Sequence, residues 1–134
     1  MSTITGSCLC EGVEFECENN FTQFHLCHCT QCQKITGSAH ASNLFISSEK
    51  IKCLKGESLI KRYDVPNRSI SSAFCKECGS LVPYLSSSGK TFIVPAGYLD
   101  GTPNLEAQDN IFYDEKAQWY DKAIHAKKFS KFPE

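Results

Sequence analysis

The chain has 134 residues, of which 41% are hydrophobic and 22% are charged, and its formal net charge is −1. This composition is typical of a soluble globular protein and excludes a disordered chain, which would have too few apolar residues to form a core. The small net charge argues against a nucleic-acid-binding protein, because such proteins usually present a clustered basic face. We therefore expect no nucleic-acid partner.

The length suits a single domain that covers residues 1–134. No segment reaches the ~18 consecutive apolar residues that a transmembrane helix requires, so we expect no membrane partner. The first seven residues contain neither the basic nor the apolar region of a secretory signal, which predicts a cytoplasmic location. Four lysines late in the chain predict a solvated tail: Lys122, Lys127, Lys128 and Lys131.

Short segments of alternating apolar and polar residues predict a series of β-strands. They are residues 12–18, 39–46, 51–54, 59–63, 69–74, 81–85 and 91–94. Turn-forming residues separate these segments, which predicts a mainly β fold of antiparallel sheets. Residues 30–36 are expected to form one helical turn and residues 115–122 a short helix, whereas residues 97–110, with Asp-Gly-Thr-Pro, predict a loop.

Seven of the nine cysteines occur in three tight groups, which in a reducing compartment favours metal binding over disulfides. The odd total is also one that a complete set of disulfides could not use. The groups are Cys8 with Cys10, Cys27 with Cys29 and Cys32, and Cys75 with Cys78. Two thiolates on one short turn satisfy the tetrahedral geometry of zinc at little ordering cost. Gly79 follows the last group, as in a zinc knuckle, and lets the backbone bend there.

Seven ligands divide naturally into a closed site of four and an open site of three. The triplet Cys27, Cys29 and Cys32 would leave one coordination position for water or substrate, as in a catalytic zinc site. The two pairs would form a closed, structural site, which gives two zinc ions per chain. A second arrangement stays open, in which His28 or His25 completes the triplet as another closed site.

The remaining cysteines and histidines have simpler interpretations. Cys17 and Cys53 lie in apolar-patterned strands, where a free cysteine behaves as a small buried hydrophobe. His28 lies between two of the predicted ligands, and we expect it to support the site from outside the metal's coordination. His40 and His125 are expected to be packing or surface residues.

The ordered cysteine groups resemble those of a known family. Residues 6–13 (GSCLCEGV), 26–38 (LCHCTQCQKITGS), 74–80 (FCKECGS) and 110–119 (NIFYDEKAQW) are similar to segments of the glutathione-dependent formaldehyde-activating enzyme family. That family also includes the centromere protein V-like proteins. The resemblance extends over about residues 6–132, nearly the whole chain.

The resemblance implies a fold, a pair of metal sites and an activity. The implied fold is Mss4-like, with antiparallel sheets held together by a structural zinc at Cys8, Cys10, Cys75 and Cys78. The implied catalytic zinc is held by Cys27, Cys29 and Cys32. The implied activity is that of a carbon–sulfur lyase that joins formaldehyde to glutathione. The chain departs from the family at two positions, with Gln33 in place of a common Arg and Asn110 in place of a frequent His.

If the protein is an enzyme, a glutathione-like thiol is expected to bind at the triplet and attack an aldehyde carbon. The segment Thr36-Gly37-Ser38 would then offer hydrogen-bond donors to the substrate, and Lys34 would pair with its carboxylate. The alternative is a non-catalytic interaction module with an Mss4-like fold, in which both zinc ions are structural. A nucleic-acid-binding zinc ribbon is a third class, which the overall charge disfavours.

Overall fold

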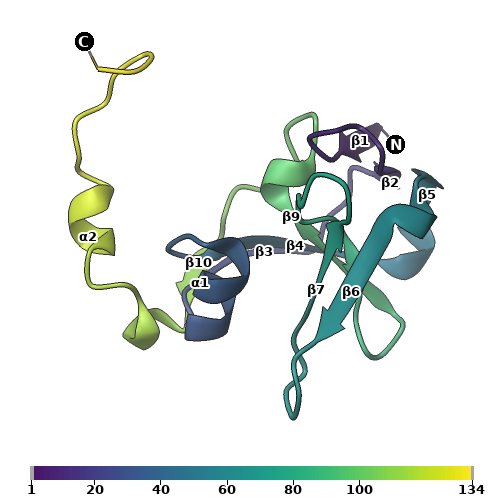
Figure 1. Cartoon of the computed structure of the whole chain (residues 1–134), viewed down its shortest axis with the longest axis horizontal. Helices are drawn as coiled ribbons and strands as arrows, with labels where there is room; N and C mark the ends of the chain where they lie inside the picture. Colours follow the sequence, from purple (N-terminus) through teal and green to yellow (C-terminus); the bar gives the residue numbers. More distant parts are fainter. Residues whose placement is uncertain (1, 134) are drawn as a thin grey trace.

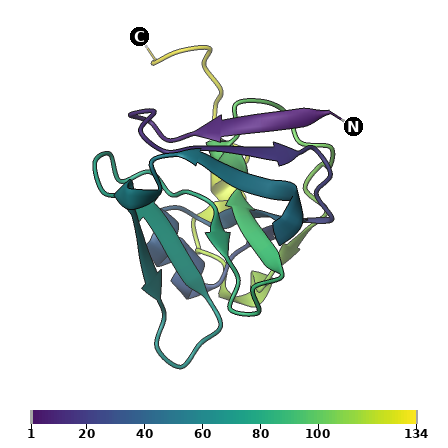
Figure 2. The same ribbon diagram turned by 90° about the vertical axis from the view of Figure 1, so that its right-hand side faces the viewer.

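The structure is a computed structural model that describes residues 2–133. Short strands dominate it and form three sheets, which lie against one another on one side of the molecule (Figures 1 and 2). The first sheet has the order β1 (Thr3–Ser7), β2 (Glu14–Glu18), β5 (Ile51–Lys55). The second has the order β10 (Asp109–Ile111), β3 (Gln23–Cys27), β4 (Ala41–Ser47), β9 (Thr91–Pro95), β8 (Tyr84–Leu85). The third is the hairpin of β6 (Ile60–Asp64) and β7 (Ser71–Cys75).

Helices are few and short. The α-helices are α1 (Thr30–Thr36) and α2 (Tyr120–Ala123), and single 3-10 turns cover Ser48–Lys50, Glu57–Leu59, Ala96–Tyr98 and Tyr113–Glu115. Among residues 2–133 no helix has the length and apolar character needed to cross a membrane. The mainly β, antiparallel fold class expected from the sequence is therefore confirmed.

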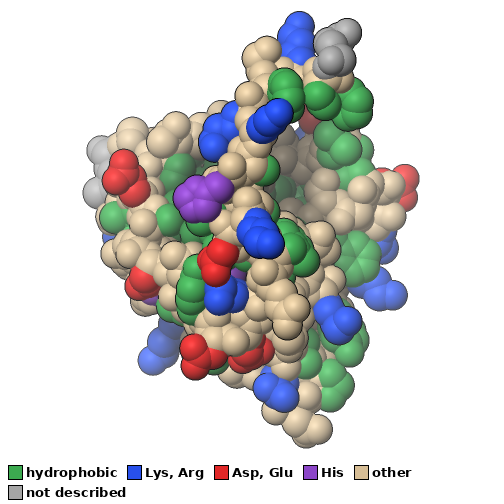
Figure 3. All heavy atoms as spheres, turned by 90° about the vertical axis from the view of Figure 1, so that its left-hand side faces the viewer, with side chains coloured by type: hydrophobic (Ala, Val, Ile, Leu, Met, Phe, Trp, Pro, Cys, Tyr) green, Lys and Arg blue, Asp and Glu red, His purple; other side chains and the backbone are tan. Residues whose placement is uncertain are grey.

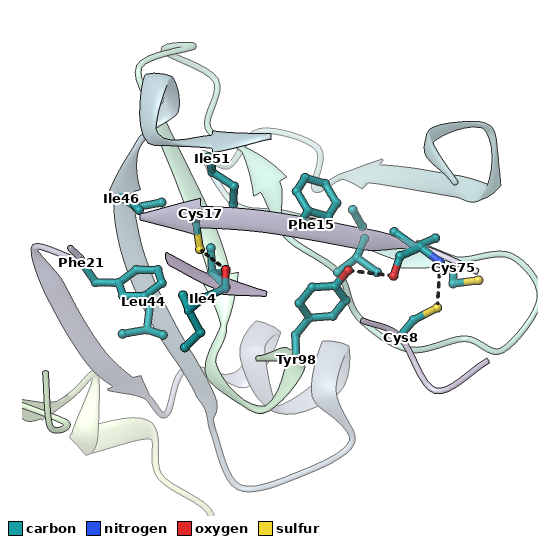
Figure 4. Close-up of a cluster of buried hydrophobic side chains, with 14 residues drawn as sticks. Ile4, Cys8, Phe15, Cys17, Phe21, Leu44, Ile46, Ile51, Cys75 and Tyr98 are labelled. Atoms are coloured by element: carbon teal, nitrogen blue, oxygen red, sulfur yellow. Dashed lines mark hydrogen bonds between the residues drawn. The ribbon is translucent and has the colours of Figure 1, made fainter. Parts of the chain in front are cut away.

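The main core lies between the sheets and contains side chains from β1, β2, β4, β7 and β9 (Figure 4). On β4, Leu44 and Ile46 alternate with less buried residues and are both fully buried, as expected for a strand with one face on the core. Tyr98 is buried beside Phe15, and its hydroxyl donates to the backbone carbonyl of Val13 at 2.9 Å. The phenol thus fills the core while its polar atom is satisfied.

Seven predicted strands occur with shifts of at most three residues at their ends, whereas three observed strands were not predicted: β1, β3 and β10. The unpredicted β10 overlaps the end of the segment expected to be a loop, residues 97–110, and pairs with β3 in parallel. The short helix expected at residues 115–122 occurs only at its end, as the four-residue helix α2, and the bounds were wrong because the turn Tyr113–Glu115 and irregular backbone precede it. The helix expected at residues 30–36 is confirmed as α1.

The segment after β10 leaves the sheets, passes α1, and carries α2 away from the body of the molecule (Figure 1). In the space-filling view of this side, the surface is hollowed beside the segment that leads to the C-terminus (Figure 3). Its four lysines are exposed, as the predicted solvated tail requires. Large apolar side chains are exposed with them, including Phe129 at 57% and Phe132 at 88%.

Candidate metal centres

The sulfur atoms of Cys8, Cys10, Cys75 and Cys78 all lie within 4.8 Å of one another, and we call this cluster the quartet site. Cys10 Sγ is 3.8 Å from Cys75 Sγ, and Cys8 Sγ is 3.6 Å from Cys10 Sγ. Four thiolates at ~2.3 Å from a tetrahedral zinc are separated by roughly 3.8 Å. The spacing of the sulfurs therefore matches a zinc tetrahedron, and the quartet site could hold the ion.

Local backbone structure aims these four sulfurs at one point. Cys8 and Cys10 occupy the turn after β1, where the Val13 N–H donates to Cys8 Sγ at 3.3 Å. Cys75 ends β7, and the Gly79 N–H closes the following turn by donating to the Cys75 carbonyl at 2.8 Å. Gly79 has φ +77°, a left-handed conformation that glycine adopts without a steric penalty. The two turns come from segments far apart in sequence, so an ion there would join two sheets.

At the quartet site hydrogen bonding favours a thiolate at Cys78, whereas the pKa of Cys10 is raised to about 12: a hydrogen bond from the Gly12 backbone lowers it, but the neighbouring thiol of Cys8 helps to raise it. Cys78 Sγ lies 3.3 Å from Ser80 Oγ, and hydrogen bonds from the Ser80 side chain and backbone lower the pKa of Cys78 to about 5. A thiol with that pKa is ionised at neutral pH, and the thiolate is the form that binds a metal.

The sulfurs of Cys27, Cys29 and Cys32 also lie within 4.8 Å of one another, and we call this cluster the triplet site. Cys27 ends β3, and Cys29 is the N-cap of α1, where its sulfur accepts from the Cys32 N–H at 3.3 Å. The helix ends at Gly37, whose N–H donates to the Gln33 carbonyl at 2.8 Å. A strand end followed at once by a capped helix is what folds three sulfurs onto one point.

Burial makes bare thiolates unfavourable at the triplet site. It raises the pKa of both Cys27 and Cys32 above the ordinary value of a thiol. Without a cation these two groups are therefore neutral thiols, whereas a bound metal would ionise them. The donor set of three clustered sulfurs fits zinc, which accepts thiolates readily.

No histidine joins the triplet site within the part of the chain that the structure describes. Both ring nitrogens of His25 are engaged elsewhere, with Asp109 and Gln23. His28 is fully buried, and its Nε2 lies 2.9 Å from Asn110 Oδ1. The triplet therefore stands as three sulfurs, the arrangement expected of an open site, and the alternative closed site with His25 or His28 has no geometric support.

His28 occupies a small aromatic cluster beside the triplet site. Its ring centroid lies 5.0 Å from that of His40, 5.1 Å from Tyr113 and 4.7 Å from Tyr120. His28 Nδ1 is buried with no hydrogen-bond partner among the described residues. Burial, followed by the proximity of His28, lowers the pKa of His40. His40 thus packs, as expected, but it packs next to the candidate metal site.

A cleft of about 420 Å³ opens beside the triplet site, and we call it the triplet cleft. It is lined by Cys27, Cys29, Thr30, Gln31, Arg68, Ser69, Ile70, Phe112 and Glu115. Residues 68–70 come from the turn between β6 and β7, and Phe112 and Glu115 come from the segment after β10. The Glu115 carboxylate accepts from the Thr30 N–H at 3.0 Å, which caps the first turn of α1. Two of the three cysteines, Cys27 and Cys29, thus line a cleft that a small molecule could enter.

The substrate-contact residues expected from the sequence lie elsewhere. Lys34, Gly37 and Ser38 are exposed around the end of α1 and do not line the triplet cleft. Thr36 turns inward, and its hydroxyl donates to the Cys32 carbonyl at 2.8 Å. The cleft residues that sequence reasoning missed are Arg68, Phe112 and Glu115, which no local pattern connects to the cysteines.

The sequence profile of the family described as "Glutathione-dependent formaldehyde-activating enzyme" matches residues 3–115. The chain belongs to this family. The match stops short of residue 132, the end of the resemblance expected from the sequence, so α2 and the segment after it lie outside the matched region. A search among curated proteins finds no match.

A crystal structure of a Rhodobacter sphaeroides protein is similar to this member of the family, with a TM-score of 0.63. The two chains are 22% identical, and the similarity covers 79% of this chain and 98% of that one. At this identity the likeness supports the fold alone.

Gln33 and Asn110, the positions where the sequence was expected to depart from the family, both form hydrogen bonds with His28. The Gln33 side-chain amide donates to the His28 carbonyl at 2.8 Å and to the Glu115 carbonyl at 2.9 Å. The Asn110 side chain faces the His28 ring, and the backbone N–H of His28 donates to the Ile111 carbonyl at 3.0 Å. The two side chains therefore connect the segment that carries the triplet cysteines with β10 and with the residues after it, rather than bonding the sulfurs.

Cys17 and Cys53, the cysteines outside the two clusters, contact the core. Cys17 is buried, and its thiol donates to the Ile4 carbonyl (Figure 4). Cys53 is half-buried at the edge of the same cluster. His125 is exposed. These positions agree with the simple interpretations made from the sequence.

Proposed function

We propose that this protein is a zinc-dependent carbon–sulfur lyase that joins a small, glutathione-like thiol to an aldehyde. The quartet site would hold the structural zinc, and Cys27, Cys29 and Cys32 would hold the catalytic zinc. The observation that carries the proposal is the triplet site itself: three clustered sulfurs, no fourth protein ligand among the described residues, and a cleft lined by two of the three cysteines. Membership of the formaldehyde-activating family supports the same reaction class.

When bound, zinc at the triplet would supply the positive charge that keeps a substrate thiol ionised at neutral pH. The substrate thiolate attacks the carbonyl carbon of the aldehyde, and a carbon–sulfur bond forms. The π electrons of the carbonyl move to its oxygen, which then takes up a proton. The reverse reaction breaks the same bond and releases the aldehyde.

The chain's own residues hold the cleft in shape for this reaction. Glu115 caps α1 through the Thr30 N–H, and Gln33 joins the carbonyls of His28 and Glu115. These bonds fix the segment that carries the three cysteines against the residues after β10, which form another wall of the cleft. Because each of these bonds has a backbone group as one partner, they fix the backbone of the segment that carries the three sulfurs before a substrate arrives.

The same proposal places the protein in the cytoplasm as a single domain, with a small thiol as its partner and neither nucleic acid nor a membrane. The alternative is a non-catalytic interaction module in which both zinc ions are structural. That alternative needs a closed second site, and the triplet offers three ligands.

Cobalt substitution tests the proposal, because thiolate-to-cobalt charge-transfer bands change when another sulfur reaches the metal. Glutathione should change the spectrum of the cobalt-loaded protein, and its S-methylated analogue should not. The Cys29→Ser variant should lose the response to glutathione while keeping the bands of the quartet site. Equal responses to both ligands, or no response to either, would favour the non-catalytic module.

A further inference from the structure

We propose that Arg68 and Phe112 bind the thiol in the triplet cleft, with Arg68 selecting thiols that carry a carboxylate and Phe112 packing against the carbon chain of any thiol. This inference rests on the proposed function, since it concerns the thiol bound at the triplet site. Neither residue belongs to a cysteine motif, and neither was singled out by the sequence. Both line the cleft together with Cys27 and Cys29.

Arg68 provides a positive charge in the cleft that the protein itself does not use. The residue lies in the turn between β6 and β7, and its side chain is exposed. Within residues 2–133 its guanidinium forms neither an ion pair nor a side-chain hydrogen bond, whereas Arg62 on the same hairpin bonds Asp64, Leu85 and Ser71. A guanidinium presents a planar fork of donors that matches a carboxylate. Arg68 is therefore available to a ligand, and Arg62 is not.

The acidic side chain in the cleft does not cancel this charge. Glu115 has one carboxylate oxygen committed to the Thr30 N–H and hydroxyl at the start of α1. No salt bridge joins it to Arg68 within the described residues. Glu115 acts as a cap for the helix that carries Cys32, and Arg68 remains the cation that faces the cleft.

Phe112 contributes a wall that the backbone holds in an unusual conformation. Its φ of +52° and ψ of +40° place it in the left-handed region, which a bulky side chain rarely adopts. The ring is 61% exposed, so burial in the core does not explain the conformation. Residues held in this way cluster at ligand-binding sites. The conformation directs an aromatic ring to the cleft beside the sulfurs, where it can pack against the carbon chain of a thiol.

Two thiols of similar size, 3-mercaptopropionate and 2-mercaptoethanol, test the assignment with the cobalt-loaded protein. Each is titrated against the unmodified chain, Arg68→Ala, Arg68→Lys and the matched control Lys34→Ala, which removes an exposed cation from outside the cleft. The readout is the ratio of the two dissociation constants, and comparing this ratio between variants cancels the different acidities of the thiols.

We expect Arg68→Ala to reduce the preference for the carboxylate by about tenfold, the effect of losing one charged hydrogen-bonded contact. Arg68→Lys should keep part of the preference, and Lys34→Ala should keep all of it. Phe112→Asn should weaken both thiols equally, because Asn tolerates the left-handed backbone but removes the ring. Phe132→Asn, a change at an 88% exposed ring outside the cleft, is its control.

The possible results separate this inference from the proposed function. Spectral changes with both thiols but an unaltered ratio in Arg68→Ala would overturn the assignment of Arg68 and leave the metal chemistry in place. Unaltered affinities in Phe112→Asn would overturn the assignment of Phe112. A spectrum that neither thiol changes, in any variant, would overturn the proposed function and this inference with it.

Discussion

The imidazole of His28 lies edge-to-face against the phenol ring of Tyr120, with ring centroids 4.7 Å apart. His28 lies between two proposed ligands of the triplet site, whereas Tyr120 belongs to α2, outside the region that matches the family. Helix α2 therefore covers His28, which lies between the proposed ligands Cys27 and Cys29. Tyr113 extends the cover, with its ring centroid 5.1 Å from that of His28 and 6.4 Å from that of Tyr120.

The first prediction follows from this contact. Tyr120→Ala should lower the free energy of unfolding by about 1–3 kcal/mol, because it removes an aromatic contact and opens His28 to water. Urea denaturation measures the change. The neighbouring Trp119 is 57% exposed, so Trp119→Ala should change stability by less than about 0.5 kcal/mol. Equal effects of the two substitutions would show that Tyr120 does not hold the cover in place.

The second prediction separates the two metal sites by their effect on folding. Cys75→Ser or Cys8→Ser should unfold or aggregate the protein, because the quartet site joins distant segments and metal binding there is part of the folding free energy. Cys29→Ser should leave the protein folded, since the triplet site is built within one short segment. Circular dichroism and thermal melting check the ranking, and the reverse order would contradict this division of the ligands.

The two sulfur clusters could be predicted from the sequence, because a zinc site requires cysteines at short, recognisable spacings along the chain. Cys27, Cys29 and Cys32 converge through one strand end and one capped turn, and both are readable from neighbouring residues. The quartet site required a further inference: because zinc takes four ligands, the pair at residues 8–10 was expected to meet the pair at residues 75–78. The structure brings these residues together as that count of ligands suggested.

The walls of the triplet cleft could not be predicted in the same way. Arg68 lies in a hairpin turn and Phe112 follows a three-residue strand, so nothing in either segment indicates which part of the fold it packs against. Strand β10 itself was missed because three residues are too few to show alternation, and its pairing with β3 is a long-range contact. Lys34, which was expected from the sequence to pair with the substrate carboxylate, is close to the triplet cysteines in sequence but does not line the cleft.

The third prediction concerns the close approach of two turns. A Cβ atom at Gly56 would lie 1.9 Å from the Gly12 carbonyl oxygen, and φ there is +84°. Gly56→Ala should therefore destabilise the protein by about 2 kcal/mol or more, through both the clash and the left-handed backbone. Gly89→Ala is the control, because φ is +76° but no atom lies within 4 Å of the added Cβ. If both substitutions lowered the melting temperature equally, the clash with Gly12 would not contribute to the loss of stability.

The fourth prediction concerns acidification of the zinc-loaded protein. Protons compete with metal for thiolates, so metal affinity falls as pH falls. Burial raises the pKa of Cys27 and Cys32, which makes protonation of the triplet site easier. In the quartet site the pKa of Cys78 is lowered to about 5 and that of Cys10 is raised to about 12, so the difference between the sites comes mainly from the number of sulfurs that would hold the ion, four at the quartet and three at the triplet. The triplet should therefore release its ion first. A colorimetric zinc chelator should detect two phases, and Cys29→Ser should abolish the one at higher pH.

The fifth prediction concerns the two hydrogen bonds that Gln33 donates. Its amide nitrogen lies 2.8 Å from the His28 carbonyl and 2.9 Å from the Glu115 carbonyl, so one donor joins the metal loop to the cleft wall. Gln33→Glu keeps the shape of the side chain but replaces the donor by a carboxylate, which would face two carbonyl oxygens. We expect a loss of about 1–3 kcal/mol in unfolding free energy, measured in urea.

Gln31→Glu, on the same helix but without such bonds, is the matched control. Hydrogen exchange should quicken at the His28 amide, which donates to Ile111, in Gln33→Glu and not in Gln31→Glu. Unchanged exchange with an equal loss of stability in both variants would mean that the added charge on α1, rather than the lost bonds, is responsible.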